Sequence, residues 1–154
     1  MSNPGIARIS AAVPSSDRPE RCWTERLRKP ARHDVYLTNV VKHFNWEARG
    51  KRRIHRKPNL SHIRACRPWL DAEIGVVDPQ VLVLLGATAA QSLLGRDFRV
   101  TGHRGEIADS SLAPLVMATV HPSSILRARD SAARHAELEA FVRDLRVVAG
   151  AMRR

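Results

Sequence analysis

The sequence predicts an α/β fold with three layers and a mainly parallel central sheet. The apolar run from Val81 to Leu85 does not alternate with polar residues, which is typical of a strand buried on both faces of a parallel sheet. Strand-like and helix-like segments alternate along the chain after residue 33. With 154 residues, the chain is long enough to bury one core and suits a single domain.

The individual elements follow from local patterns. The β-branched run from Val35 to Val41 predicts a first strand, and residues 59–78 predict a helix capped by Asn59 or Ser61. The apolar face of that helix consists of Ile63, Cys66, Leu70 and Ile74. A buried strand, a short helix, a third strand and a closing amphipathic helix are expected at residues 81–86, 87–95, 115–120 and 130–150.

The chain divides into three parts of different character. Residues 1–32 are expected to form an irregular or disordered leader, because the first 31 residues show neither a helical nor a strand period. Residues 33–150 hold all the predicted elements and form the folded domain. Residues 151–154 form a short basic tail.

Charge and apolar content narrow the classes of function. The formal net charge is +11, and the segment from Arg21 to Pro68 holds 14 basic residues against 3 acidic ones. Such a block favours a polyanionic partner such as nucleic acid, with a solvated basic surface as the alternative. The longest apolar run is too short to span a bilayer and no signal peptide is present, so we expect a cytoplasmic protein without a membrane partner. Two cysteines, Cys22 and Cys66, cannot form a disulfide framework, although one of them can be a metal ligand.

Candidate site residues follow the predicted strands. Ligands of open parallel sheets bind beyond the carboxyl ends of the strands, and Asn39 and His121 stand at two such ends. The turn after His121 adds the hydroxyl groups of Ser123 and Ser124, which suit phosphate oxygens, and an apolar tip. The alternative is a turn-forming asparagine and a surface histidine without a chemical role.

Several segments, in order and spacing, together resemble one family. They are VYLTNVVKHF, GKRRIHRKP, ACRPWLDAEI, LGATAAQSLLG, RGE and TVHPSSILRA. This set resembles the uracil-DNA glycosylase superfamily, and within it the UdgX type of the iron-sulfur-containing family-four branch. The resemblance runs from about His33 to Val148 and implies the uracil-DNA glycosylase-like three-layer fold.

The resemblance implies a role for each matched residue. Asn39 would read the edge of a flipped uracil, and His121 would donate a hydrogen bond to the uracil carbonyl oxygen as the glycosidic bond breaks. His55, in the KRRIH segment, would attack the sugar carbon and join the protein covalently to abasic DNA. The surrounding cations would hold phosphates and keep the imidazole of His55 neutral. The residues assigned to substrate binding are Asn39, Lys51, Arg52, Arg53, Ser123, Ser124 and Arg127. The alternative is a phosphate clamp in which His55 has no chemical part.

A four-iron four-sulfur cluster is the cofactor that the resemblance implies. Two of its ligand positions fall on His43 and Cys66, and imidazole replaces thiolate in some such centres. The early Cys-x-x-Cys pair of the branch is missing, because Cys22 stands alone. The ligand set is therefore incomplete in this sequence.

The leader is where the sequence departs from the family. The family's Gly-Glu-Gln-Pro-Gly-like loop does not occur in residues 1–31, so we expect an N-terminally truncated fold without a normally central strand, and impaired activity. Residues 11–30 can be back-translated with permissible codons and then read in a shifted frame that starts at the third base of each codon. This frame gives GRPFVGPAG, a segment like the base-stacking segment of the family. The leader is therefore interpreted as an out-of-frame reading.

Two functions are compatible with these sequence features. The first is a glycosylase that excises uracil from DNA, preferably single-stranded, and acts as a monomer. The second is a basic module that binds single-stranded DNA without chemistry.

Overall fold

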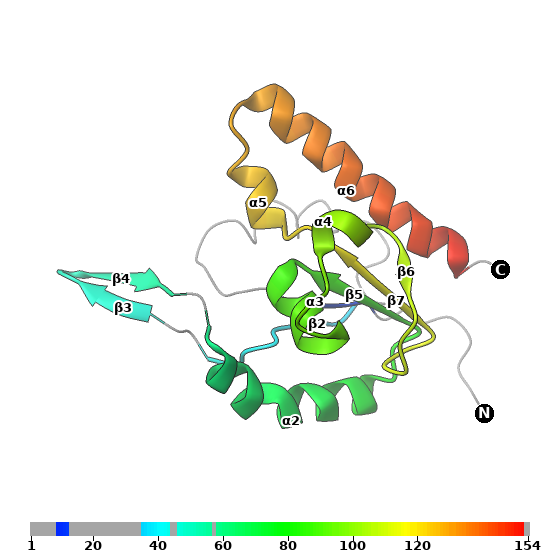
Figure 1. Ribbon diagram of the computed structural model, residues 1–154, viewed down its shortest axis with the longest axis horizontal. Helices are drawn as coiled ribbons and strands as arrows, with labels where there is room; N and C mark the ends of the chain where they lie inside the picture. The colour runs from blue at the N-terminus through cyan, green and yellow to red at the C-terminus, as the bar shows by residue number, and fades with distance from the viewer. Residues whose placement is uncertain (1–8, 13–34, 44–45, 57, 153–154) are drawn as a thin grey trace.

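The computed structural model describes residues 9–12, 35–43, 46–56 and 58–152 (Figure 1). Its elements in chain order are β1 (Ile9–Ala12), β2 (Leu37–Thr38), β3 (Trp46–Arg49), β4 (Arg52–His55), α2 (Leu60–Val77), β5 (Val81–Leu85), α3 (Ala87–Leu94), α4 (Val100–His103), β6 (Ile107–Ala108), β7 (Leu115–Thr119), α5 (Pro122–Leu126) and α6 (Ser131–Ala151).

The main sheet is mostly parallel, as predicted. Its strand order is β2-β1-β5-β7-β6, and every neighbouring pair is parallel except β6 with β7 at one edge. The carboxyl ends of β2, β1, β5 and β7 therefore meet at the same edge of the sheet.

Helices cover both faces of this sheet, which confirms the three-layer arrangement. All of β5 is buried, and its residues alternate between two apolar clusters. Leu82 and Leu84 belong to the cluster that includes Leu70 of α2 and Ala90 of α3. On the other face, the cluster of Val81, Val83 and Leu85 includes Phe141 and Val148 of α6. Figure 1 shows α2 and α6 on opposite sides of the sheet.

Helix α2 begins and ends where the sequence indicates. The Asn59 side chain accepts a hydrogen bond from the backbone N–H of His62 at 3.0 Å, which satisfies one of the free donors at the helix start. The helix ends at Asp78, whose left-handed backbone lets its N–H bond back to the carbonyl of Ile74. The buried face of Cys66, Leu70 and Ile74 matches the prediction, and Ile63 packs partly buried beside it.

The N-terminal strand β1 is a correction to the prediction. The sequence predicts no strand in residues 1–32, yet β1 lies within them and pairs in parallel with both β2 and β5. The sheet thus has an inner strand at this position. Four residues are too few to show a strand period, and their strand state depends on the neighbouring strands rather than on intrinsic propensity. The rest of the predicted leader lies outside the described residues.

Other elements differ from the prediction in length or type. The predicted first strand, Val35 to Val41, is reduced to Leu37–Thr38 in β2. The sequence predicts a proline-fixed turn after His121. In the structure, these residues form the short helix α5.

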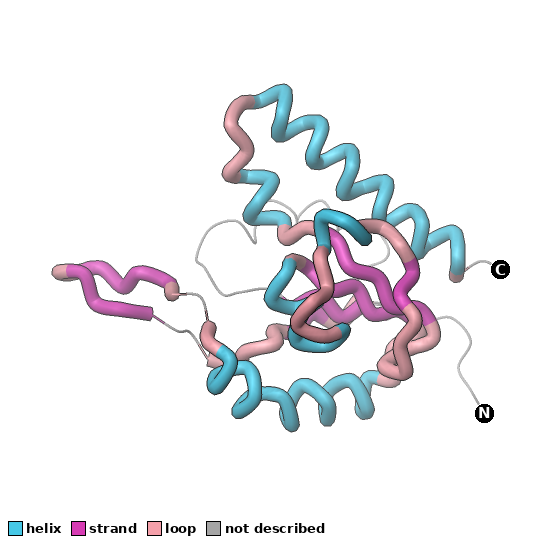
Figure 2. Tube along the Cα trace, in the orientation of Figure 1, coloured by secondary structure: helices cyan, strands magenta, loops and turns pink. Residues whose placement is uncertain are grey.

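The basic segment forms a separate β-hairpin, which its sequence pattern does not predict. Strands β3 and β4 pair from Arg49–Arg52 next to the turn to Trp46–His55 at the far end. Gly50 occupies the turn with a φ of +60°, a value that favours glycine. Figure 2 shows the hairpin extending away from the sheet and its helices. Among the described residues, no helix is long and apolar enough to cross a membrane.

Candidate active site

Asn39 and His121 stand at the same edge of the sheet, as predicted. Asn39 directly follows β2, and His121 lies two residues beyond the end of β7. Strands β1 and β5 separate β2 from β7, so about three strand spacings, or roughly 14 Å, lie between the two strand axes. Both residues therefore border the edge at which ligands of parallel sheets bind.

Each of these residues has one buried polar atom without a hydrogen-bond partner among the described residues, and we call such an atom open. Asn39 Oδ1 and His121 Nε2 are buried and have no hydrogen-bond partner within the described part of the chain. Buried polar atoms in folded proteins are nearly always hydrogen-bonded, because an unpaired one costs about 1–3 kcal/mol. Two such atoms at the ligand edge of a parallel sheet therefore indicate a polar ligand between them.

The fold fixes the tautomer of His121. His121 caps α5, and its Nδ1 accepts the backbone N–H of Ser123 at 3.0 Å. A backbone N–H can only donate, so Nδ1 carries no proton, and the hydroxyl of Ser123, 2.7 Å away, also donates to it. The proton of the neutral ring must then lie on Nε2, the open atom.

The same environment keeps the ring neutral. Burial lowers the pKa of His121 from 6.5 to about 4, and the positive charge of Arg127 contributes to the shift. At neutral pH, His121 is therefore uncharged, and its Nε2–H is a buried donor without a partner among the described residues.

The two serines after His121 contact that residue in the structure, and their predicted role in phosphate binding stays a prediction. The sequence predicts that their hydroxyl groups contact phosphate oxygens. In the structure, the hydroxyl of Ser123 contacts the His121 ring, and the hydroxyl of Ser124 donates to the His121 carbonyl at 2.7 Å. Both hydroxyl protons are therefore used to hold His121.

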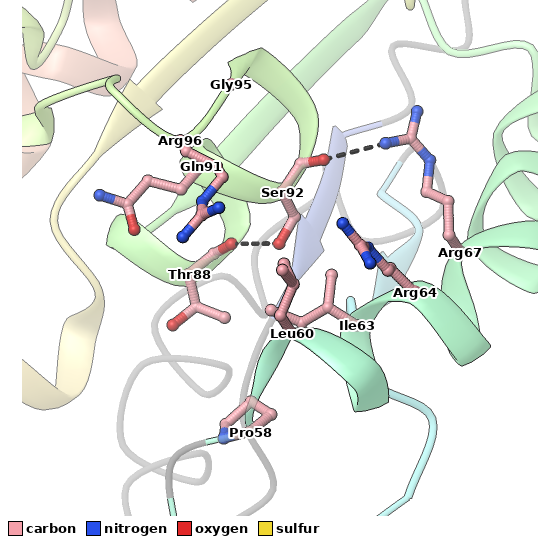
Figure 3. Close-up of a pocket in the computed structure, with 10 residues that line it drawn as sticks. All are labelled: Pro58, Leu60, Ile63, Arg64, Arg67, Thr88, Gln91, Ser92, Gly95 and Arg96. Atoms are coloured by element: carbon pink, nitrogen blue, oxygen red, sulfur yellow. Dashed lines mark hydrogen bonds between the residues drawn. The ribbon is translucent and has the colours of Figure 1, made fainter.

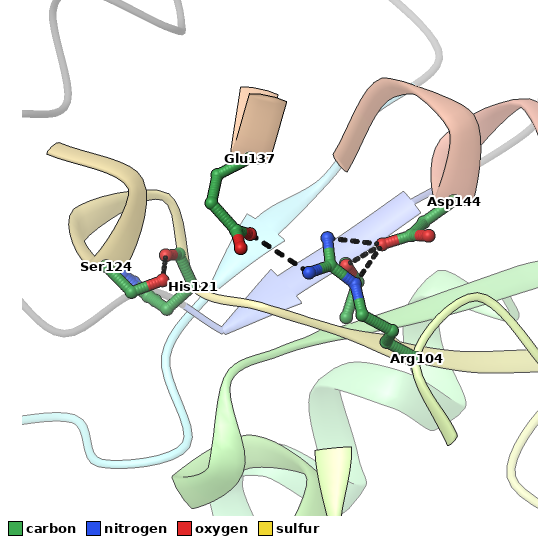
Figure 4. A network of polar contacts seen from close by, with 6 residues as sticks. Arg104, His121, Ser124, Glu137 and Asp144 are labelled. Carbon is green, nitrogen blue, oxygen red and sulfur yellow. Dashed lines mark hydrogen bonds and ion pairs between the residues drawn. The ribbon is translucent and has the colours of Figure 1, made fainter. Parts of the chain in front are cut away.

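A partly buried ionic network anchors the strand end that carries His121 (Figure 4). Thr119, the last residue of β7, is fully buried, and its hydroxyl donates to Asp144 Oδ2 at 2.5 Å. Arg104 Nε and Nη2 each lie 3.0 Å from the same oxygen, and Arg104 Nη1 contacts Glu137 at 3.0 Å. The network ties β7 to α6 immediately before the catalytic candidate.

Gly86, directly after β5, packs closely against His121. It has a φ of +85°, and its N–H donates to the carbonyl of Thr119 at 2.8 Å. A Cβ at this position would lie 2.9 Å from His121 Cβ. Only glycine allows the turn between β5 and α3 to approach His121 this closely.

The loop that carries Asn39 is fastened to α2 in a similar way. Glu73 of α2 accepts hydrogen bonds from Thr38 and Lys42, which flank Asn39 on either side, and the Lys42 ammonium lies 2.5 Å from its carboxylate. Burial alone would raise the pKa of Glu73, but the hydrogen bonds from Lys42 and Thr38 leave it below its usual value. Glu73 is thus ionised at neutral pH and fixes the loop.

Comparisons with known proteins show the family of this chain. The model of the family described as "Uracil DNA glycosylase superfamily" matches residues 7–146. The chain belongs to the uracil-DNA glycosylase superfamily, a superfamily of DNA glycosylases. It is 34% identical over 139 residues to a protein named Type-4 uracil-DNA glycosylase from Thermotoga maritima, a match that covers 88% of this chain and 69% of the relative. It is 30% identical over 135 residues to a protein of the same name from Pyrobaculum aerophilum, covering 80% of this chain and 64% of the relative.

In this uracil-DNA glycosylase superfamily member, the KRRIH segment lies in the hairpin. His55 is the last residue of β4 and pairs with Trp46, at the end of the hairpin nearest α2. Lys51 is exposed at the turn, and Arg56 forms an ion pair of 3.3 Å with Glu47. The side chains of Arg52, Arg53 and His55 lie outside the described part of the structure, so their roles stay predictions.

The two predicted ligands of the iron-sulfur cluster, His43 and Cys66, lie next to each other. His43 Nδ1 is 3.7 Å from Cys66 Sγ, and the backbone N–H of Lys42 donates to the same sulfur at 3.3 Å. The ring of His62 stands edge-on to that of His43, with 5.1 Å between centroids. A cluster of this kind needs four protein ligands. The described residues contain no group of three or more possible ligands, so they do not complete the set.

Sequence reasoning missed the residues that hold the site in place. Asp144 and Glu73 lie on helices, far from Thr119 and Thr38 in the chain, and nothing in their local pattern shows these contacts. Gly86 was the one accessible signal, because a glycine directly after a buried strand often marks a close backbone approach.

Proposed function

We propose that this chain recognises uracil in DNA and cleaves its N-glycosidic bond. The observation that carries the proposal is the open Nε2 of His121, a neutral donor at the carboxyl edge of the sheet, facing the same edge as the open Oδ1 of Asn39. Both relatives named above carry the name of uracil-DNA glycosylases. A base must leave the helix to reach a site of this kind, so the substrate is a flipped nucleotide.

Asn39 and His121 have different roles in this proposal: Asn39 recognises the base, and His121 stabilises the leaving group. The Asn39 amide has an acceptor and a donor, which suit the N–H and carbonyl groups on the edge of uracil. As the glycosidic bond breaks, its electron pair moves onto the uracil ring and negative charge grows on a carbonyl oxygen. His121 donates its Nε2–H to that oxygen, and one such donor is typically worth about 10²–10³ in rate.

We further propose that His55 completes the reaction of a UdgX-type protein. A neutral imidazole nitrogen donates its lone pair to the electron-poor sugar carbon while uracil leaves with the bonding electrons. The product is abasic DNA joined to the histidine ring. The cations of the hairpin support this step, because they bind flanking phosphates and disfavour a charged ring. The step requires the hairpin to lie along bound DNA with His55 at the sugar.

Incubation with a uracil-containing single strand tests both parts. We expect release of uracil and a protein–DNA band that survives denaturing electrophoresis. His55→Ala should abolish the band and keep salt-sensitive binding, whereas His121→Ala should slow both uracil release and band formation. Salt-sensitive binding without any release of uracil would instead support the second function, a non-catalytic module for single-stranded DNA.

The proposal extends to the strand preference, the monomeric state, the cytoplasmic location and the cofactor. Binding of single-stranded DNA is supported by the net charge of +11. Duplex competition, gel filtration and cell fractionation test the first three features in turn. The four-iron four-sulfur cluster on His43 and Cys66 stays a prediction, tested by visible absorbance of anaerobically purified protein.

Impaired activity and an out-of-frame leader also stay predictions. Their support is the lack of a Gly-Glu-Gln-Pro-Gly-like loop in residues 1–31. Sequencing the coding DNA upstream of Arg32 tests the shifted frame, and a single frame without a family-like alternative would remove it.

A further inference from the structure

A cationic cavity lies between α2 and α3, outside the Asn39–His121 site. Its volume is about 590 Å³, within the range of ligand pockets in proteins. Figure 3 shows side chains from the first half of α2 on one side and from α3 and the turn after it on the other. The lining residues are Pro58, Leu60, Ile63, Arg64, Arg67, Thr88, Gln91, Ser92, Gly95 and Arg96. Three of them are arginines and none is acidic.

The three arginines of the cavity are not equivalent. Arg67 spans the two helices, since its Nη1 donates to the carbonyl of Ser92 at 2.9 Å and its Nε to Asp71 at 2.6 Å. It therefore links α2 to α3 at the cavity. Arg64 and Arg96 are exposed and form no hydrogen bond or ion pair with any residue that the structure describes. Their guanidinium groups are free to bind an anion in bidentate geometry.

The cavity also has an apolar wall. Leu60 and Ile63 lie one turn apart on the α2 face that lines it, and Pro58 adds to the same side. Leu60 is 39% exposed although it is apolar. An apolar wall beside free guanidinium groups matches the two halves of a nucleotide, a base and a phosphate.

The position of the cavity indicates which kind of anion it binds. Pro58 lies three residues after the end of the basic hairpin, and Thr88 lies two residues after Gly86, which packs on His121. One lining residue thus follows the cationic hairpin closely in the chain, and another follows the glycine that packs on His121. A free nucleotide would need no such continuity, whereas a DNA strand that runs from the hairpin to the uracil site would pass through it.

We propose that the α2–α3 cavity binds a nucleotide of the same DNA strand, next to the one taken into the Asn39–His121 site; the assignment of that second site rests on the proposed function. Arg64 and Arg96 hold the phosphate of the neighbouring nucleotide, and Leu60 and Ile63 contact its base. This subsite contributes to affinity for any single strand, whether or not the strand contains uracil.

Binding of a fluorescent thymine-only single strand, measured by anisotropy over a range of salt concentrations, tests this proposal without relying on excision. The Arg64→Ala/Arg96→Ala variant should raise Kd at least about tenfold and lower the slope of log K against log salt by about two. Arg143→Ala/Arg146→Ala removes the same charge from exposed positions on α6, on the other face of the sheet, and should change Kd by less than about threefold. Equal effects of the two double variants would overturn the proposal.

Two further measurements separate the base from the phosphate and the strand from a free nucleotide. Leu60→Ser should weaken binding of the thymine strand and leave binding of an abasic strand unchanged. Thymidine monophosphate should compete only at concentrations far above those of the strand. Tighter binding of the mononucleotide than of the strand, or equal losses for both strands with Leu60→Ser, would contradict the proposal. Because none of these probes contains uracil, failure here is distinct from failure of the glycosylase reaction.

Discussion

Thr119 donates its hydroxyl hydrogen bond to Asp144 at 2.5 Å, two residues before the histidine that faces the substrate edge. The threonine side chain is fully buried, and the aspartate is held in turn by Arg104. The contact links the closing helix to the end of β7. Its function is therefore expected to be positional, through His121, rather than chemical.

Replacing this hydroxyl should affect catalysis more than binding. Thr119→Val keeps the shape of the side chain, and we expect a loss of about 1 kcal/mol in the free energy of unfolding. Uracil release under single-turnover conditions should slow at least about tenfold, while Kd for a uracil-free strand stays within about twofold. Thr101→Val, at an exposed site in α4, serves as the control. A parallel loss of rate and affinity would show that the contact is only structural.

The neutral state of His121 should be visible by titration. We expect NMR of the labelled imidazole to give a pKa of about 4, because burial and Arg127 oppose the charged form. Arg127→Gln should raise this pKa, whereas Arg129→Gln, at a 91% exposed position where the guanidinium pairs with Asp130, should leave it unchanged. A pKa near 6.5 in the folded protein would contradict the assignment of His121 as an uncharged donor.

The same pKa has a consequence for stability. The unfolded chain protonates His121 near pH 6.5, and the folded chain only near pH 4, so the unfolded state binds more protons between these values. The contribution of His121 to the free energy of unfolding should therefore be complete above pH 6.5 and decline as pH falls towards 4. Urea titrations of the wild-type protein and of His121→Gln over this range measure the difference. An unchanged pH dependence in the variant would refute the prediction.

Gly86 should not tolerate a side chain. Gly86→Ala places a methyl group 2.9 Å from His121 Cβ on a backbone with a φ of +85°. We expect a loss of about 1–3 kcal/mol in stability and a larger relative loss of uracil release. Gly75→Ala is a matched control, because this helical position has open space and should gain about 0.5–1 kcal/mol. Thermal unfolding and single-turnover rates distinguish the two effects.

Glu73 should determine how well Asn39 discriminates between bases. Glu73→Gln removes the charge that binds Lys42 and weakens the attachment of the Asn39 loop to α2. We expect the uracil-to-cytosine ratio of single-turnover base-release rates to fall by about tenfold, with little change in binding of uracil-free DNA. Glu139→Gln, on the exposed surface of α6, is the control. An unchanged ratio would show that the Asn39 loop is held by other contacts.

The parts of the fold that could be predicted are those with a strong local signal. The buried run of β5, the capped helix α2 and the long helix α6 each carry enough apolar pattern to identify them. Asn39 and His121 could be placed at one edge because parallel strands share their carboxyl ends. Strand β1 could not be predicted, because its strand state comes from pairing with β2 and β5. The tautomer of His121 also escaped prediction, since it depends on the three-dimensional course of α5.

The inner position of β1 bears on how the chain reaches its native state. Ile9 pairs with Val81, and Ala11 pairs with Leu37, so β1 is synthesised before both of its partner strands. Contacts so distant in sequence slow folding, because a long loop must close before they form. Until β5 emerges, the edge of β1 remains open to pairing with other chains. Expression at low temperature and with a tag at the carboxyl end should therefore increase the yield of native protein.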